Sequence, residues 1–519
     1  MGALPNDLLR PGTELQETHI SWVFLVGDDV YKVKKPVSLG FLDFSTLKKR
    51  REACEAEVRL NLRLAKDMYR GVVPITLDRD GRHRFGGEGE PVDFAVHMRR
   101  LPDADRADVR LERGALTMDD VERVAELVER FHRESGASAA AAPHGEVRAI
   151  RFNVLENFEQ TKSTITEYLE PRQVKELEAW QVAFLDAHAE WFEERVRGGR
   201  IRDGHGDLRL EHVYLGEQGK VTILDCIEFN ERFRFADVCA DVVFLAMDLA
   251  WHGRVDLAEA FIARYAREAG DYDLYPLVDF YQSYRAFVRA KIASMTAHDE
   301  AASLGARERA SAHARRYFLL ALASERRPLV PPTVVAVGGI IASGKSTIAK
   351  ALGREMPSPV VDADRTRKEL AGVAAFHPLP EGPWAGFYTE EFTRKVYSEI
   401  RRRASAVLAS GRPVVLDASF RARSHRAEAR ELARSTGVPF VFVECRAPDE
   451  VCRERLRERQ KERSVSDGRL EVFNDFARSW EPVDELSPSE HVVLDTRSSV
   501  AENLATLART IPLAPGLTG

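Results

Sequence analysis

One short segment constrains the fold of this chain more than any other: a glycine-rich loop between an apolar run and a helical stretch. The loop runs from Gly339 to Ser346, and its sequence GIIASGKS fits the pattern G-x-x-x-x-G-K-[ST]. The β-branched run 333–337 before it is typical of a buried parallel strand, and the residues after it predict a helix. In this context the backbone N–H groups of the loop wrap phosphates, so the segment predicts a nucleotide-binding α/β domain.

The loop residues have distinct expected roles in binding ATP and Mg²⁺. Lys345 is expected to reach the β and γ phosphates, and the Ser346 hydroxyl is expected to bind the metal ion. A chance match in a glycine-rich loop is the alternative, and the correct flanks on both sides argue against it. The other residues expected to cradle the nucleotide are Gly339, Ser343, Gly344 and Thr347.

Acidic residues follow two later strands of this half. Asp364 comes just after a strand, where a carboxylate can accept the proton of an attacking hydroxyl; the alternative is that it caps the next helix. Arg367, three residues on, can hold a phosphate or a carboxylate. Asp417 ends another apolar run and is expected to support Mg²⁺, or else to close a strand-end turn. The predicted strands, which alternate with helices as in a parallel sheet, are 333–337, 360–362, 414–417, 440–445 and 491–494.

A helix predicted near residues 453–463 carries alternating charges. Arg455, Arg459 and Arg463 are spaced by four and therefore share one face. Such a pattern usually marks a solvated face. The functional alternative is a mobile lid whose arginines close over the transferring phosphate, with Arg459 as our candidate for a nucleotide contact.

A proline-rich break precedes this α/β domain. The sequence ERRPLVPP at 325–332 predicts a short stiff linker, which we place at 329–332. The domains are then 1–328 and 333–519. In the first domain a small sheet with one helix comes before a mostly helical body that starts near Met118, so we expect an N-lobe at 1–101 and a C-lobe at 102–328. The elements expected in the N-lobe are a hairpin of 21–26 and 30–33, a helix at 47–66 and a strand at 93–98.

The first domain carries its own acidic motif. Asp207 lies in the sequence HGD, and Asp225 follows the next apolar strand, VTIL. In the protein-kinase scheme the first aspartate accepts the proton of the substrate hydroxyl, while the residue five positions on and the later aspartate bind the metal ion. The residue five positions on is His212, and a neutral imidazole is a poor ligand for Mg²⁺. Either metal binding is altered, or Asp225 holds the ion almost alone, or this half has weak activity.

A lysine-rich strand of the first domain supplies candidates for phosphate binding. Lys32 and Lys34 lie on one face of the strand because side chains alternate. We favour Lys32 as the lysine that holds the α and β phosphates, paired with Glu57 in the following helix, with Glu52 and Glu55 as alternative partners. The alternative without a binding role is a set of solvated lysines on an edge strand.

These motifs resemble two known groups of enzymes. The HGD loop followed by ILDCIEF is similar to the aminoglycoside phosphotransferase, choline kinase and fructosamine kinase superfamily, which has asparagine at the position of His212. Asp237 and Asp241 resemble that superfamily's DxxxD tail, which implies that they brace the catalytic loop. The segments GGIIASGKST, VVDADRTRKEL and VVLDASFRARSHR resemble the small P-loop kinases of the gluconate kinase, chloramphenicol phosphotransferase, zeta-toxin and polynucleotide 5′-kinase type.

The order of the two halves resembles bacterial proteins catalogued as bifunctional aminoglycoside phosphotransferase/ATP-binding proteins. The resemblance implies an α+β protein-kinase-like N-terminal domain of the aminoglycoside phosphotransferase type and an α/β P-loop NTPase kinase domain at the C-terminus. It also implies two ATP- and Mg²⁺-dependent modules that phosphorylate hydroxyl groups of small molecules, such as a sugar, an amino sugar or an aminoglycoside-like compound.

Two alternatives stay open. The kinase-fold half could be a non-catalytic binding or regulatory domain, or the chain could be a nucleic-acid end kinase. A net charge of −6, without a basic stripe interleaved with aromatic residues, argues against nucleic acid. The five cysteines are scattered, and there is neither a leader-like segment nor an apolar run of the roughly 18 residues that span a bilayer. We therefore expect a cytoplasmic protein without a membrane partner.

Overall fold

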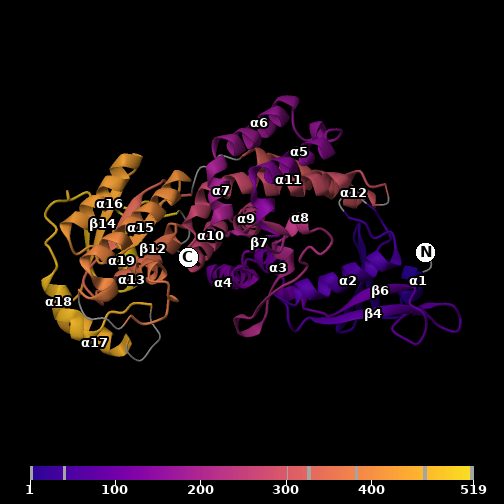
Figure 1. Cartoon of the computed structure of the whole chain (residues 1–519), viewed down its shortest axis with the longest axis horizontal. Helices are drawn as coiled ribbons and strands as arrows, with labels where there is room; N and C mark the ends of the chain where they lie inside the picture. Colours follow the sequence, from indigo (N-terminus) through magenta and orange to yellow (C-terminus); the bar gives the residue numbers. More distant parts are fainter. Residues whose placement is uncertain are drawn as a thin grey trace. The chain divides into compact units, whose positions relative to one another are not determined.

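A computed structural model describes residues 4–38, 42–300, 302–323, 329–379, 384–459 and 465–514. The chain forms two compact units (Figure 1). Unit 1 comprises Met1–His252 and Tyr281–Leu322, and unit 2 comprises Gly253–Phe280 and Ala323–Gly519. The segment Gly253–Phe280, which the sequence-based division places in the C-lobe of the first domain, is therefore a part of unit 2.

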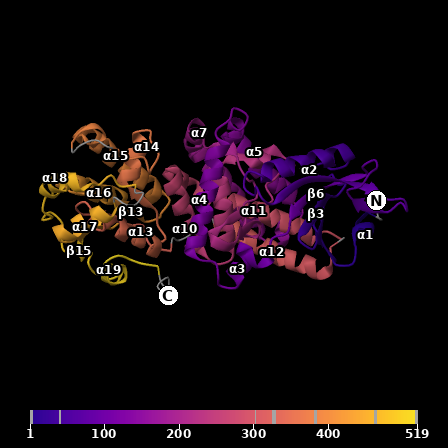
Figure 2. The same ribbon diagram turned by 90° about the horizontal axis from the view of Figure 1, so that it is seen from below.

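Unit 1 begins with a six-stranded antiparallel sheet in the order β1-β2-β3-β6-β4-β5. The predicted hairpin is confirmed as β2 and β3, which turn at Gly27 with a φ of 57°, where glycine has no steric penalty. Helix α2 packs against β4 and β6, and Figure 2 shows it beside this sheet. The elements are α1 (Leu4–Leu8), β1 (Thr13–Glu17), β2 (Ser21–Val26), β3 (Asp29–Lys34), α2 (Leu47–Asn61), β4 (Tyr69–Leu77), β5 (His83–Phe85) and β6 (Asp93–Arg99).

Helix α2 ends at Asn61, five residues before the predicted end. The Asn61 side chain donates to the carbonyl of Glu57, 2.9 Å away, and accepts the N–H of Cys226, also at 2.9 Å. Asn61 thereby ties the end of this helix to the segment that contains Asp225.

The rest of unit 1 is mostly helical, as predicted. Helix α9 forms its centre, because twelve of its fourteen residues are buried. Two short two-stranded sheets, β7 with β10 and β8 with β9, flank the HGD loop. The elements are η1 (Asp103–Asp105), α3 (Ala107–Glu112), α4 (Met118–Ser135), η2 (Ala142–Gly145), α5 (Val147–Thr161), η3 (Ile165–Glu167), α6 (Pro171–Ala187), α7 (Ala189–Arg197), β7 (Ile201–Asp203), η4 (Leu210–His212), β8 (Val213–Leu215), η5 (Glu217–Gly219), β9 (Val221–Ile223), α8 (Glu231–Arg234), β10 (Phe235–Asp237), α9 (Val238–Trp251), α11 (Val278–Ala297) and α12 (Leu304–Leu322).

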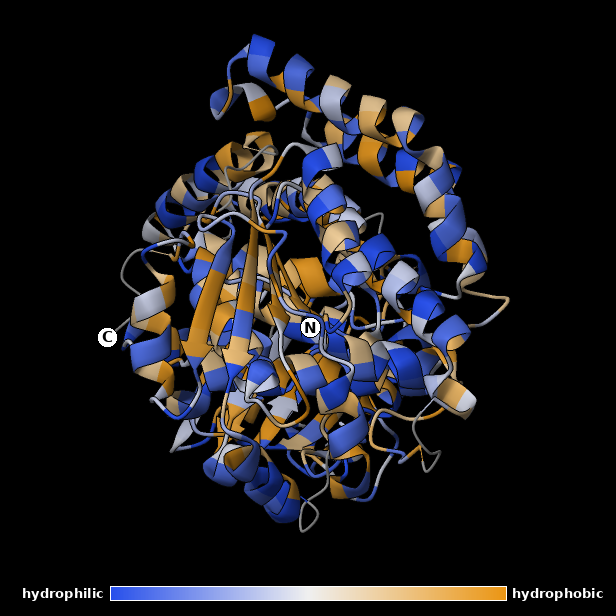
Figure 3. Ribbon diagram, turned by 90° about the vertical axis from the view of Figure 1, so that its left-hand side faces the viewer, coloured by the Kyte–Doolittle hydropathy of each residue, from blue (hydrophilic) through white to orange (hydrophobic). Residues whose placement is uncertain are grey.

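Unit 2 contains a five-stranded parallel sheet in the order β12-β13-β11-β14-β15. Helices α13 and α19 pack together on one face, and α15 and α16 cover the other (Figure 1). Strands covered on both faces are apolar along their length; all five residues of β11 are buried, and hydrophobic residues run along the strands in Figure 3. All five predicted strands are confirmed to within one residue.

The carboxyl ends of the strands position the polar residues of unit 2. Asp362 and Asp417 are register partners at the ends of β12 and β13, beside the strand that leads into the glycine-rich loop. No helix within the described residues is long and apolar enough to cross a bilayer. The elements of unit 2 are α10 (Val255–Ala269), η6 (Tyr272–Leu277), β11 (Val334–Gly338), α13 (Lys345–Glu355), β12 (Val360–Asp362), α14 (Ala363–Leu370), η7 (Gly386–Tyr388), α15 (Glu390–Ala409), β13 (Val414–Asp417), α16 (Arg423–Thr436), β14 (Phe440–Arg446), α17 (Asp449–Arg459), η8 (Leu470–Val472), α18 (Phe473–Arg478), β15 (His491–Asp495) and α19 (Val500–Leu507).

Candidate functional site

The glycine-rich loop of unit 2 is folded back tightly on itself. Gly339 has a φ of 151°, and a Cβ atom there would lie 2.4 Å from Ser343 Oγ and 2.5 Å from the carbonyl oxygen of Cys445. Gly344 has a φ of 88° and precedes the first turn of α13. These two positions therefore require glycine, one for close packing and both for their backbone conformation.

The side chain of Arg455 supports the loop through hydrogen bonds to the loop backbone and to Thr496. Its guanidinium donates to the carbonyl of Ala342 at 3.3 Å and to Oγ1 of Thr496 at 3.0 Å. Thr496 in turn donates from Oγ1 to the carbonyl of Ser343 at 2.7 Å. Arg455 is thus a brace of the loop in this structure, a role that the helix pattern did not indicate. Arg459 lines the cavities described below, and Arg463 lies outside the described residues.

Lys345, Ser346 and Asp417 come together at the end of the loop. Burial raises the pKa of Asp417 to about 6; Asp362 and Asp364 push it the same way, while Lys345 and a hydrogen bond from Ser346 oppose the shift. Asp417 Oδ1 is buried and has no hydrogen-bond partner among the described residues, and the same holds for Ser343 Oγ. Asp417 lines the cavity described below, where a bound cation would satisfy its oxygen.

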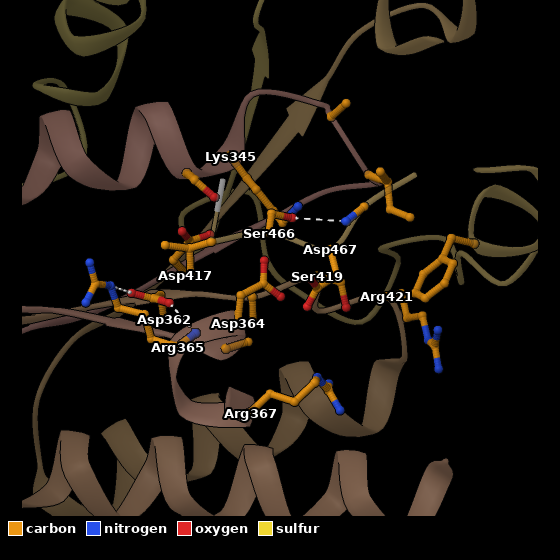
Figure 4. A pocket seen from close by; sticks show the side chains of 18 of the residues that line it. Lys345, Asp362, Asp364, Arg365, Arg367, Asp417, Ser419, Arg421, Ser466 and Asp467 are labelled. Atoms are coloured by element: carbon orange, nitrogen blue, oxygen red, sulfur yellow. Dashed lines mark hydrogen bonds and ion pairs between the residues drawn. The ribbon is translucent and has the colours of Figure 1, made fainter. Parts of the chain in front are cut away.

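A cavity of about 590 Å³ opens beside these residues (Figure 4). Asp364 extends into it together with Lys345 and Asp417. The helix cap that the sequence offers as the alternative role of Asp364 belongs to Asp362, whose Oδ1 accepts the N–H of Arg365 at 2.8 Å. Asp364 is therefore not needed for capping.

Arginines and aromatic rings form the opposite part of the cavity. Arg367 Nη1 donates to the carbonyl of Phe387 at 2.5 Å, and its guanidinium lies 4.6 Å from the ring centroid of Tyr388. Arg421 lies 3.9 Å from the ring centroid of Trp384, and burial lowers its pKa. Cationic donors held over aromatic rings suit a ligand with a carboxylate or phosphate group.

A second cavity of about 360 Å³ also borders the loop. It shares Ala342, Gly344, Thr347 and Arg459 with the first cavity and adds residues of α17, α19 and the turn around Thr496. Both cavities therefore border the glycine-rich loop and the start of α13.

Charged residues of unit 1 form an ion-pair network. Lys32 contacts Asp225 and lies 3.1 Å from Oε1 of Glu57, as Nζ to oxygen. Lys34, which is 0% exposed, contacts both Glu57 and Glu228. The sequence pointed to Lys32 and Glu57, and the structure adds the buried pair of Lys34 with Glu228. Burial raises the pKa of Glu228, with Lys34 opposing the shift.

Asp207 lies in the HGD loop close to Arg209 and His212. Arg209 donates to both carboxylate oxygens of Asp207, at 2.9 and 3.0 Å. Burial alone would raise the pKa of Asp207, but Arg209 holds it below its ordinary value. His212 Nδ1 lies 2.8 Å from the carbonyl oxygen of Asp207, which can only accept, so Nδ1 carries the hydrogen. Its Nε2 faces a donor, Arg209 Nη2, at 3.5 Å and lies 3.7 Å from Oδ2 of Asp225.

The HGD loop is braced from α9 and α11. Asp241 accepts the N–H groups of His205 and Gly206 at 2.5 and 2.9 Å, as expected. Arg285, which was not predicted as a functional residue, donates to the carbonyl of Gly206 at 3.1 Å. Asp237 instead accepts two hydrogen bonds from Arg195 and caps α9.

Metal binding was predicted for residues of both units. Within the described ranges no group of three or more His, Cys, Asp or Glu side chains is arranged to hold a metal ion. The predicted metal roles of His212, Asp225, Ser346 and Asp417 therefore stay predictions, although Asp225 lies near His212 and Asp417 near Ser346.

The similarity of this chain to known proteins shows the family to which it belongs. The Uncharacterized protein Rv2004c of Mycobacterium tuberculosis is 33% identical over 447 residues, which cover 86% of each chain. The chain belongs to the family of this mycobacterial protein. Residues 334–483 also match a family model described as AAA domain. A gluconokinase from Sinorhizobium meliloti 1021 is 25% identical with a TM-score of 0.26, over 36% of this chain and 94% of that chain. A choline/ethanolamine kinase family protein from Mesorhizobium loti is 13% identical with a TM-score of 0.35, over 60% and 91%.

Proposed function

We propose that this chain is an ATP- and Mg²⁺-dependent phosphotransferase, and that unit 2 transfers the γ-phosphate of ATP to a hydroxyl group of a small molecule. The observation that carries the proposal is that Lys345, Asp417 and Asp364 line one cavity at the end of the glycine-rich loop. Phosphoryl transfer depends mainly on positioning and on charge stabilisation. The residues in this cavity can supply both.

The residues around the loop fit a nucleotide with its metal ion. A side chain at Gly339 would clash with the loop, and Asp417 Oδ1, which has no partner among the described residues, offers a polar atom at the cavity. Lys345 and Ser346 would hold the phosphates and the ion, and the second cavity at Thr347 would take the base and ribose. When bound, Mg²⁺ neutralises charge on the phosphates.

The larger cavity fits the acceptor. Asp364 would accept the proton of the acceptor hydroxyl, since it projects into the cavity and is not used to cap α14. Arg367 and Arg421 would bind an anionic group of the acceptor. This favours small acceptors that carry a carboxylate or phosphate besides the hydroxyl.

The test is transfer of labelled phosphate from ATP by the full-length chain to a panel of sugars, sugar acids, amino sugars, aminoglycosides, nucleosides and oligonucleotides. Lys345→Ala should lower turnover at the P-loop by about a hundredfold or more, because the lysine stabilises transferring charge. Lys395→Ala, which changes a lysine 62% exposed on α15, is the matched control and should leave turnover unchanged. Unchanged turnover in Lys345→Ala would refute the proposal for unit 2. Transfer mainly to oligonucleotide ends would favour the end-kinase alternative.

We also propose that unit 1 carries a second phosphotransferase site, with Lys32 and Glu57 for the phosphates, Asp225 for the metal ion and Asp207 as the base. The arrangement of Lys32 between Glu57 and Asp225 supports it. The binding-module alternative is supported by His212, because its Nε2 faces Arg209 and not an open position. Turnover that remains in Lys345→Ala and disappears when Asp207→Asn is added would favour a second active site; absence of any remaining turnover would favour the binding module.

A further inference from the structure

The segment Gly253–Phe280 is built into the P-loop unit although it precedes the linker by about fifty residues of chain. Its helix α10 and the turn η6 pack against β12 and α15. Tyr272, which is 2% exposed, donates from its hydroxyl to the carbonyl of Val360 at 2.8 Å. Gly270, with a φ of 60°, brings the end of α10 so close to Glu369 that a Cβ atom would lie 2.7 Å from that carboxylate. The segment therefore packs closely on the strand and helix that lead to Asp364.

Two buried ion pairs join this segment to the turn between β12 and α14. Arg267 Nε lies 3.2 Å from Oδ2 of Asp362. Glu268 accepts two hydrogen bonds from Arg365, at 3.0 and 3.1 Å, in the bidentate geometry that arginine and carboxylate favour. All four side chains are less than one fifth exposed, so water competes weakly with these bonds.

Asp362 connects these contacts to the site. One of its oxygens accepts the N–H of Arg365 and so starts α14, and the other oxygen is held by Arg267. Asp364 is in the first turn of the same helix and projects into the cavity. Arg267 itself lines this cavity, as do Asp362 and Lys345. A change at Arg267 therefore affects Asp364 in two steps: it releases the carboxylate of Asp362, and this alters the first turn of α14.

We propose that Arg267 is a positioning residue of the P-loop site, which fixes the direction of Asp364 through Asp362. This inference rests on the proposed function, because it assigns a supporting residue to the same reaction. It means that a segment that precedes the linker completes the site that the glycine-rich loop begins. The interaction with Asp362 orders a catalytic side chain, whereas a purely structural contact would affect only folding.

The experiment is a double-mutant cycle on ATP hydrolysis by the full-length chain, with water as the acceptor. Arg267→Ala should lower kcat by about tenfold while the KM for ATP changes less than about twofold, because the nucleotide contacts are untouched. Arg267→Lys should restore part of kcat, since it keeps the charge next to Asp362. In an Asp364→Asn background, Arg267→Ala should have almost no further effect, because residues that act through one another are not additive.

Arg402→Ala is the matched control. Arg402 also pairs with the segment, through Asp273 at 2.6 Å, but this contact is half exposed. Its loss should leave kcat unchanged. Equal effects of Arg267→Ala in both backgrounds, or a fall in ATP affinity as large as the fall in kcat, would overturn the inference. Should Arg267→Ala fail to fold, as shown by its melting curve, Arg267→Lys alone in the two backgrounds decides the question in the same way.

The two proposals fail differently. Unchanged hydrolysis in Lys345→Ala would refute the function proposed for unit 2. Hydrolysis that is lost in Lys345→Ala and unchanged in Arg267→Ala would leave the proposed function standing and refute only the role of Arg267.

Discussion

Asp417 leads to an unusual prediction: replacing this residue should weaken nucleotide binding and yet stabilise the empty protein. Its carboxyl is buried, 6% exposed, and its pKa is raised from 3.8 to about 6. A difference of this size corresponds to about 3 kcal/mol of disfavoured ionisation. Because the folded-state pKa lies above the unfolded value, the protonated carboxyl supports folding at low pH, and this contribution is lost as the pH rises from about 4 to about 6.

Asp417→Asn replaces the carboxylate with a neutral group of the same shape. The gain in the free energy of unfolding should be near zero below pH 4, about half of its maximum at pH 5, and at most about 3 kcal/mol above pH 6. Urea unfolding of the full-length chain without nucleotide, followed through the transition of unit 2 at pH 5 and pH 8, measures this gain. Asp364→Asn is the matched control in the same cavity; its carboxylate is partly exposed, so its gain should be smaller.

Titration calorimetry with ATP, with and without Mg²⁺, gives the second half of the prediction. In Asp417→Asn the improvement in ATP affinity that Mg²⁺ causes should largely disappear, since the anion that supports the ion is gone. Wild-type affinity in the presence of Mg²⁺ should also fall as the pH drops through about 6. A variant that is less stable than wild type at pH 8, or whose response to Mg²⁺ is unchanged, would refute the reasoning.

Three other substitutions test the glycine-rich loop, the buried ion pairs of unit 1 and the candidate site of unit 1. Gly339→Ala should lower ATP affinity by at least about tenfold, because the new Cβ would lie 2.4 Å from Ser343 Oγ; calorimetry measures it, and wild-type affinity would contradict the packing argument. Lys34→Met should destabilise unit 1 by about 3 to 5 kcal/mol in urea unfolding, since it leaves buried carboxylates unpaired. Adding Glu228→Gln should recover part of this loss, and no recovery would show that Lys34 acts mainly by packing. In the Lys345→Ala background, Asp207→Asn should remove any remaining phosphate transfer.

The sheet of unit 2 could be predicted closely because its signals are local. Runs of β-branched residues such as 414–417 are compatible with few structures other than a buried strand, and the glycine-rich loop determines the turn and the helix after the first of these strands. Because parallel strands end at one edge, the meeting of Asp417 with Lys345 could be foreseen.

Roles that depend on tertiary contacts could not be predicted in the same way. The sequence allows either Asp362 or Asp364 to cap α14. Only the hydrogen bond from the N–H of Arg365 assigns the cap to Asp362. Arg455 sits in a charged helix whose pattern does not distinguish a lid from a brace. The pairing of Lys34 with Glu228 joins two segments nearly two hundred residues apart. A periodic sequence pattern gives no information on such a distant contact.

The placement of Gly253–Phe280 shows the same limit at a larger scale. The periodicity of α10 indicates that one face is buried, but not which partner buries it. Chain order favoured the helical body around it, whereas the contacts of Tyr272 and Arg267 are with β12 and the start of α14.

The charges of the two candidate sites differ in a way that bears on their chemistry. In unit 1 the carboxylates already have cations of their own: Lys32 contacts Asp225, and Arg209 holds both oxygens of Asp207. An incoming metal ion must compete with these contacts, which lower the pKa of both aspartates despite their burial. In unit 2, Asp417 keeps a buried oxygen without a partner among the described residues and a raised pKa, so its ionised form gains most from a cation. In unit 2 a bound Mg²⁺ therefore offsets the free-energy cost of ionising the buried Asp417, whereas in unit 1 it must displace existing ion pairs. This difference makes unit 2 the stronger candidate for metal-dependent transfer.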